Sequence, residues 1–117
     1  MRCLFVPDEL EAFRPVAVVF RDERIEHVML RDYEPARLVL RAIAFDALVV
    51  GVNAIDSPAL RLLRLWKPAD LPALGVTCVP WMRDELRAAG AADVVVLPDE
   101  TARLAAALRT LSAPSRH

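Results

Sequence analysis

The 117-residue sequence lacks the features that mark several functional classes. Its 15 basic and 16 acidic residues give a net charge of −1, so it has no excess of positive charge for binding nucleic acid. No apolar run approaches the roughly 20 residues of a membrane span, and the N-terminus is too short and too soon acidic for a secretory signal. These absences predict a cytoplasmic protein that contacts neither nucleic acid nor membrane.

Cysteine, histidine and glycine are scarce as well. The two cysteines, Cys3 and Cys78, lie in apolar runs, which predicts buried free thiols in a reducing compartment. His27 and His117 are the two histidines, and the chain has three glycines. It shows neither a base beside a nucleophile nor a Gly-rich phosphate loop. No residue is therefore assigned as catalytic, and a small enzyme is the least favoured functional class.

The chain does contain a regular alternation of Val-rich runs and amphipathic segments. Hydrophobic residues make up 56% and charged residues 26% of it, which fits one globular domain. Residues 47–50 are continuously apolar, as in a parallel strand that is covered on both faces. The expected strands cover residues 2–6, 25–30, 46–52, 75–79 and 93–97.

Helix signals separate the expected strands. Ser57 followed by Pro58 is typical of an N-cap with proline in the first turn, and Gly90 is typical of a left-handed helix stop. The expected helices cover residues 15–23, 35–44, 58–67, 82–89 and 100–111. The third of these is expected to bury three large side chains, namely Leu62, Leu63 and Trp66.

One segment has two readings. Residues 16–20 form the first helix if Pro15 lies in its first turn, but they are rich enough in β-branched residues for a strand in a hairpin with residues 25–30. With the helix, strands and helices alternate throughout. That order predicts an α/β three-layer sandwich with a flavodoxin-like parallel sheet of order 2-1-3-4-5. The domain would span residues 1–111, and residues 112–117 would form a flexible tail.

In order and spacing, residues 2–111 resemble the receiver domain of bacterial two-component response regulators. Residues 2–9 resemble the family's first strand with its acidic pair, and residues 46–51 resemble the strand that ends on the phosphorylated aspartate. Residues 90–98 resemble the fifth strand, which begins at a Gly-Ala-Asp-Asp type of turn and ends in a Lys-Pro pair. Leu104 keeps the spacing from Pro98 that is found in the family's last helix. The resemblance implies a signalling module that acts through contact with proteins.

The same resemblance implies that the phosphorylation pocket is degenerate. The phosphoacceptor position falls on Gly51, and the lysine that pairs with the phosphoryl group falls on Leu97. The first acidic position falls on Pro7, while the second is kept as Asp8. The residue that offers a backbone carbonyl to the metal falls on Asn53.

The family's relay Ser or Thr falls near Pro80, which has no hydroxyl. Phosphoryl transfer to a carboxylate needs a nucleophile, Mg²⁺ and a cation on the phosphoryl oxygens, and Asp8 alone is a poor anchor for Mg²⁺. We therefore expect a pseudo-receiver that neither accepts phosphate nor binds Mg²⁺, and that needs no cofactor.

The family's usual contact surface is formed by the fourth helix, fifth strand and fifth helix. The candidate interface residues there are Trp81, Met82, Arg83, Leu86, Arg87, Arg103 and Arg109. The partner would be another protein or a second copy of the chain. Trp81 either anchors that partner or fills the pocket. The alternative function is a regulator that senses a small ligand near Asp8, Asn53 and Trp81.

Overall fold

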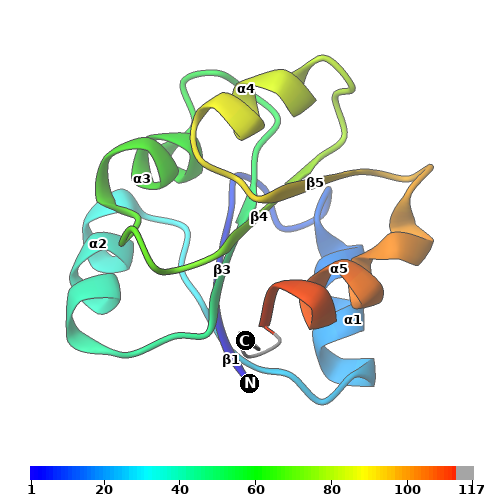
Figure 1. The fold of residues 1–117 in the computed structure, drawn as a ribbon. Coiled ribbons are helices and arrows are strands. Elements are labelled where there is room, and N and C mark those ends of the chain that lie inside the picture. Colours follow the sequence, from blue (N-terminus) through cyan, green and yellow to red (C-terminus); the bar gives the residue numbers. More distant parts are fainter. Residues whose placement is uncertain (113–117) are drawn as a thin grey trace.

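A five-stranded parallel sheet forms the centre of the chain in a computed structural model, which describes residues 1–112 (Figure 1). The strand order is β2-β1-β3-β4-β5, which confirms the expected flavodoxin-like topology. The strands are β1 (Arg2–Pro7), β2 (Glu26–Met29), β3 (Ala47–Gly51), β4 (Ala73–Thr77) and β5 (Asp93–Val96). Every residue of β3 is buried, because helices cover both faces of the central strand.

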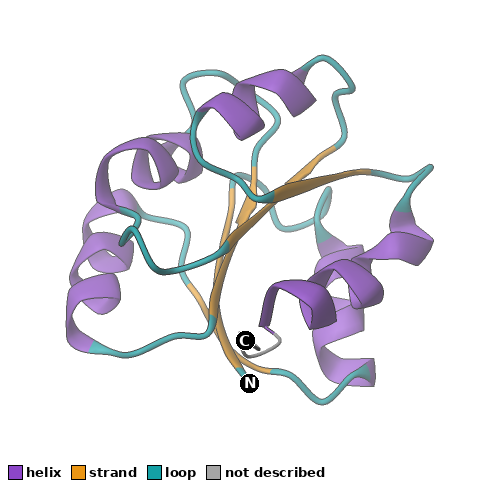
Figure 2. Cartoon of the chain, in the orientation of Figure 1, coloured by secondary structure: helices purple, strands orange, loops and turns teal. Residues whose placement is uncertain are grey.

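Helices lie on both sides of the sheet (Figure 2). The α-helices of the described part are α1 (Arg14–Asp22), α2 (Tyr33–Ala42), α3 (Pro58–Trp66), α4 (Met82–Ala88) and α5 (Leu104–Ser112). A short 3₁₀ helix, η1 (Thr101–Arg103), precedes α5. Side chains of α2, α3 and α4 pack in one core layer, and those of α1 and α5 pack in the other.

Residues 16–20 are helical, so the hairpin alternative is wrong. Pro15 lies in the first turn of α1, where its missing N–H costs no helical hydrogen bond. Val16 and Phe20 are one turn apart and both are fully buried, which gives the segment the spacing of an amphipathic helix. Burial of this helical face therefore outweighs the β-branched composition.

Strand β4 lies two residues earlier than the expected 75–79. Its first residue, Ala73, is in register with Leu48 of β3. Two side chains stop the strand after Thr77, because the Cys78 N–H donates to Asn53 Oδ1 at 2.8 Å and the Val79 N–H donates to Thr77 Oγ1 at 3.0 Å. The strand end therefore carries a threonine, which changes the chemistry of this edge of the sheet.

Trp66 is the main error among the expected core residues. Leu62 and Leu63 are buried as expected, but 38% of Trp66 is exposed. Its ring lies between α2 and α3, where the Arg37 guanidinium is 4.7 Å from the ring centroid and the indole N–H donates to the Tyr33 hydroxyl. These partners at the surface replace apolar packing for an amphipathic side chain.

The cysteines, the C-terminal tail and the absence of a membrane span were also predicted from the sequence. Both cysteines are free, and burial raises the pKa of the Cys3 thiol to about 11, whereas Cys78 is half-buried. Helix α5 includes Ser112, and residues 113–117 of the expected tail lie outside the described part. Within residues 1–112 no helix is long and apolar enough to cross a membrane.

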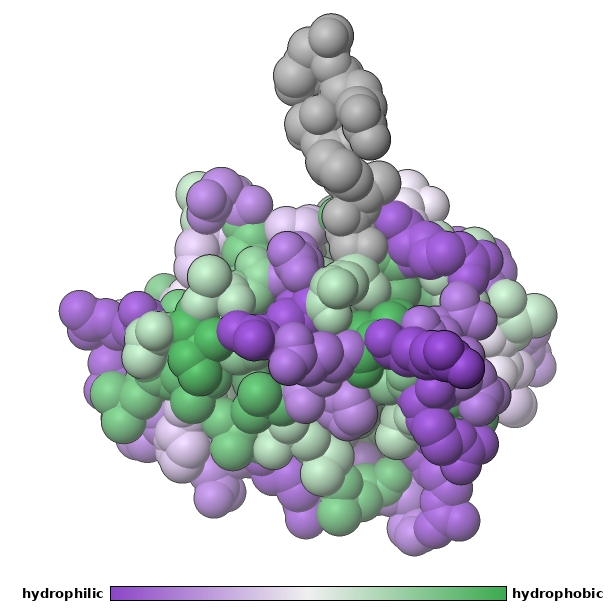
Figure 3. Space-filling model, turned by 90° about the horizontal axis from the view of Figure 1, so that it is seen from below, coloured by the Kyte–Doolittle hydropathy of each residue, from purple (hydrophilic) through white to green (hydrophobic). Residues whose placement is uncertain are grey.

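The amino ends of the strands form the opposite edge of the sheet. Seen from below in Figure 3, hydrophobic and hydrophilic residues are interspersed on this face. A shallow pocket of about 380 Å³ here is lined by apolar residues such as Leu40 and Phe45 together with the carboxylates Asp46 and Asp70. The carboxyl ends of the strands are the place to look for a site.

Candidate functional site

Four strand ends converge at the carboxyl edge of the sheet. Pro7 of β1 is in register with Gly51 of β3, and the Asp8 N–H donates to the Gly51 carbonyl at 2.8 Å. On the other side, the Leu97 N–H donates to the Thr77 carbonyl at 2.7 Å. Asp8 and Gly51 are therefore neighbours, and Leu97 lies beside the end of β4 at the same edge of the sheet.

The space above Gly51 is filled by Phe13. A Cβ atom at position 51 would lie 2.7 to 2.9 Å from three atoms of the Phe13 ring, closer than real contacts allow. Phe13 comes from the loop between β1 and α1, and only 1% of it is exposed. A side chain at position 51 thus requires the ring to move. Sequence reasoning missed Phe13, whose one signal is a large aromatic in an otherwise acidic loop.

Leu97 belongs to the same apolar layer as Phe13. It is 4% exposed, and the layer also contains Phe5 and Leu104. This layer lies beneath α1 and α5 and continues to the edge of the sheet. Neither a nucleophile nor a cation therefore faces the position above Gly51 from these residues.

Asp8 holds the loop that follows β3. One carboxylate oxygen accepts the Asn53 N–H at 2.8 Å, and the other accepts the hydroxyl of Ser57. Ser57 is 3% exposed and its Oγ also accepts the first free N–H groups of α3 at 3.0 and 3.2 Å. Burial raises the pKa of Asp8 above its ordinary value, against the opposing effect of these hydrogen bonds. Asp8 thus acts here as a tether within the protein.

Asn53 links that loop to the end of β4. Its side-chain oxygen accepts the Cys78 N–H at 2.8 Å and the Thr77 hydroxyl at 3.3 Å. Thr77 is fully buried and places a hydroxyl at the end of β4, three residues before Pro80. Pro80 itself lies in an exposed turn beyond the strand, because β4 ends earlier than expected.

A shallow pocket of about 410 Å³ lies outside this network, lined by Asp8, Arg31, Asp32 and Pro58. Arg31 crosses it and donates to the Asp8 carbonyl at 2.9 Å. No group of three or more His, Cys, Asp and Glu side chains that could hold a metal is found within residues 1–112.

The proposed interface residues do not form one accessible surface. Met82 and Leu86 are fully buried, because they form the face of α4 that packs on the sheet, so they are unavailable to a partner. Trp81, just before α4, is 61% exposed. Arg109 pairs with Glu23 next to α1 and so points to another part of the molecule.

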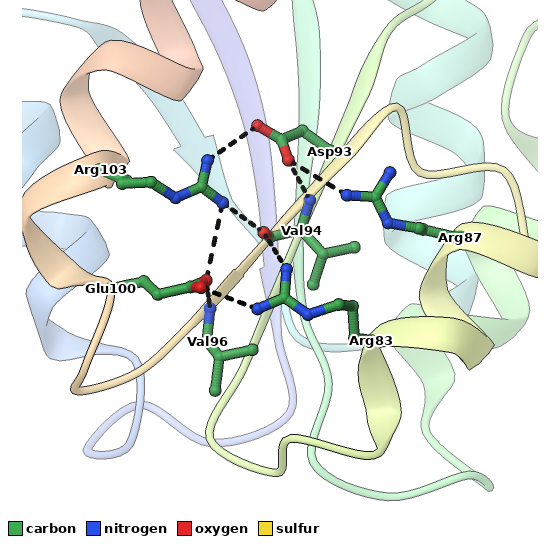
Figure 4. A network of polar contacts seen from close by, with 7 residues as sticks. All are labelled: Arg83, Arg87, Asp93, Val94, Val96, Glu100 and Arg103. Carbon is green, nitrogen blue, oxygen red and sulfur yellow. Dashed lines mark hydrogen bonds and ion pairs between the residues drawn. The ribbon is translucent and has the colours of Figure 1, made fainter.

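The other three arginines are bound within the chain (Figure 4). Arg83 pairs with Glu100 at 2.8 Å, and Arg87 pairs with Asp93 at 3.6 Å. Arg103 reaches both carboxylates, at 3.4 Å to Asp93 and 3.6 Å to Glu100. The network spans α4, β5 and η1, so the charges on this face already have partners.

Comparison with known proteins defines the class of fold. No family model and no curated protein sequence matches the chain. Among solved structures, it is similar to a receiver protein from Burkholderia phymatum, with 17% identity, a TM-score of 0.78 and coverage of 97% of this chain and 96% of that one. It is also similar to the chemotaxis response regulator CheY4 of Vibrio cholerae, with 21% identity, a TM-score of 0.74 and coverage of 94% and 97%.

A third similar structure is the response regulator TrrA from Thermotoga maritima in complex with Mg²⁺–BeF, with 19% identity, a TM-score of 0.77 and coverage of 94% and 97%. The chain therefore has the receiver-domain fold of two-component signalling proteins. At these identities, the similarity establishes the fold and leaves function to the residues themselves.

The contact between Phe13 and Gly51 predicts a specific coupling. Gly51→Ala should lower the free energy of unfolding by about 2 kcal/mol, because the added methyl group overpacks a rigid ring. In a Phe13→Leu background the same substitution should cost clearly less, since a leucine can move aside. Urea unfolding of the four variants measures both costs. Additive costs would contradict direct packing of the ring on Gly51.

Two carboxylates predict pH dependence of opposite sign. The hydrogen bond from the Val96 N–H and the nearby Arg83 and Arg103 lower the pKa of Glu100 below its ordinary 4.5. Its stabilisation is thus complete above pH 4.5 and is lost as pH falls through the lowered pKa. Asp8, with a pKa raised above 3.8, stabilises the fold most below pH 3.8, and this contribution is lost as pH rises through the raised value.

Urea unfolding across the acid range tests both signs. Glu100→Gln should flatten the loss of stability towards low pH, whereas Asp8→Asn should make that loss steeper because it removes an opposing contribution. Equal pH slopes for wild type and Glu100→Gln would show that the ionic network contributes nothing measurable.

Proposed function

We propose that this chain is a pseudo-receiver, a receiver-like domain that acts through contact with other proteins and not through phosphorylation. It would be a non-enzymatic module of bacterial cytoplasmic signalling, controlled by the presence of its partner. The observation that carries the proposal is the Phe13 ring packed on Gly51. It occupies the space that a phosphoacceptor side chain would need.

Three further features support the loss of phosphoryl chemistry. Position 51 offers no nucleophile, and Leu97 offers no cation for phosphoryl oxygens. Both carboxylate oxygens of Asp8 accept hydrogen bonds from the loop after β3, so a metal would have to break those bonds. The Thermotoga structure holds Mg²⁺–BeF, and in this chain the corresponding edge of the sheet is tied together by its own residues.

The surface near α4 remains the proposed contact region, in a narrower form than the sequence suggests. Trp81 is largely exposed and an exposed tryptophan is a common anchor for a partner. The arginines Arg83, Arg87 and Arg103 surround this region, but each already has a carboxylate partner. Contact with a partner protein at Trp81 is therefore favoured over a homodimer held by these charges.

A small-ligand sensor is the second candidate, and the outer pocket lined by Asp8, Arg31, Asp32 and Pro58 is the observation in its favour. A bound metabolite would raise the melting temperature by mass action. A thermal-shift screen with wild type and Arg31→Ala separates the two candidates, because a ligand of this pocket should lose its effect in the variant.

Phosphorylation can be tested directly. After incubation with acetyl phosphate and Mg²⁺, the intact mass of the protein should be unchanged, and Mg²⁺ with beryllofluoride should leave Trp fluorescence unchanged. A conventional receiver domain treated in parallel shows that the reagents are active. Trp81→Phe identifies which tryptophan responds if a signal appears. A stoichiometric phosphoryl adduct, or a saturable Mg²⁺-dependent change in fluorescence, would refute the proposal.

A further inference from the structure

The two outer edges of the sheet differ in how their backbone groups are bound. In an edge strand every second residue directs its N–H and C=O away from the sheet. Such unpaired groups are a template for pairing with another strand unless the protein covers them.

At the β5 edge, all the outward groups are covered. They belong to Val94 and Val96. The Val94 carbonyl accepts from Arg83 at 3.3 Å and from Arg103 at 2.8 Å, and the Val94 N–H donates to the Asp93 carboxylate at 2.8 Å.

Glu100 covers Val96 on the same edge. Its carboxylate accepts the Val96 N–H at 2.8 Å, and its own N–H donates to the Val96 carbonyl at 2.8 Å. The ionic network in Figure 4 therefore closes this edge to a further strand.

The β2 edge is open. The Glu26 N–H donates to the Met1 carbonyl at 3.2 Å, and the Leu30 N–H donates to the Phe5 carbonyl at 3.0 Å. By alternation, the backbone groups of His27 and Met29 point outward. No residue in the described part of the chain binds these four backbone groups. Both side chains are exposed, with Met29 at 43%.

We propose that β2 pairs antiparallel with β2 of a second copy of this chain, about a twofold axis at Val28. In that register His27 lies opposite Met29 of the other copy, and each such pair exchanges two hydrogen bonds. The two pairs satisfy all the outward groups of both strands. The sheets of the two copies then form one continuous sheet. This assembly does not depend on the packing of Phe13 on Gly51 or on the proposed loss of phosphorylation.

Charge complementarity supports this occupant and this register. Arg24 lies four residues before Val28 and Asp32 lies four residues after it. Arg24 lies in the turn before β2 and Asp32 lies at the start of α2, so each Arg24 would lie at the end of the contact where Asp32 of the other copy also lies. Among the ion pairs within residues 1–112, neither residue has a partner.

The closed β5 edge determines the size of the assembly. A head-to-tail arrangement, in which β2 of one copy pairs with a different edge of the next, would need a second open edge, and it would continue into a filament. After a twofold β2–β2 contact has formed, neither copy has an open edge left, so the assembly ends at the dimer.

Sedimentation velocity of the full chain over a concentration series tests the proposal. The wild type should show a concentration-dependent shift from one copy to two and no larger species. Met29→Pro removes an outward N–H that the contact with β1 does not use, so it should stay monomeric with a circular dichroism spectrum like that of the wild type.

If Met29→Pro fails to fold, exchanging the charges of Arg24 and Asp32 tests the same contact. Arg24→Asp should weaken dimerisation roughly tenfold or more, because it places two carboxylates opposite each other. Adding Asp32→Arg should restore it. A wild type that stays monomeric at every concentration would overturn the proposal. So would a dimer that is insensitive to both Met29→Pro and Arg24→Asp.

Discussion

The seating of the Phe13 ring on Gly51 is the contact on which the character of this domain depends. A parallel sheet with helices on both faces directs its chemistry to the carboxyl edge, and here that edge is filled from within. Glycine is required beneath the ring because any Cβ would come within 3 Å of it. The missing side chain at position 51 and the aromatic ring above it are therefore two halves of one packed structure.

The polar residues at the same edge follow from this arrangement. Asp8, Asn53, Ser57 and Thr77 bind one another and the backbone around them, so that the loops after β1, β3 and β4 are joined. A network whose members are all satisfied rigidifies a site and leaves little for an incoming ion. What remains for function is the outer surface, where the open edge of β2 contrasts with the covered edge of β5.

The sequence was sufficient for the topology, because Val-rich strands, proline at helix starts and Gly90 leave few alternatives to an alternating α/β order. It was also sufficient to place Gly51 and Leu97 at strand ends. The sequence did not predict features that depend on contacts between side chains. The end of β4 is set by Asn53 and Thr77, which no periodicity reveals, and so the hydroxyl was sought near Pro80. Phe13 and the arginine network were missed for the same reason, since their contacts join segments far apart in the chain.

In the proposed pseudo-receiver, this edge of the sheet is closed to Mg²⁺ and to a phosphoryl group. Backbone amide spectra recorded by NMR during titration with Mg²⁺, and then with beryllofluoride, test it at single-residue resolution. The Asn53 amide is the most direct reporter, since it donates to the Asp8 carboxylate. We expect the amide signals of Asp8, Gly51 and Asn53 to stay at their original positions. Saturable shifts confined to these residues would contradict it.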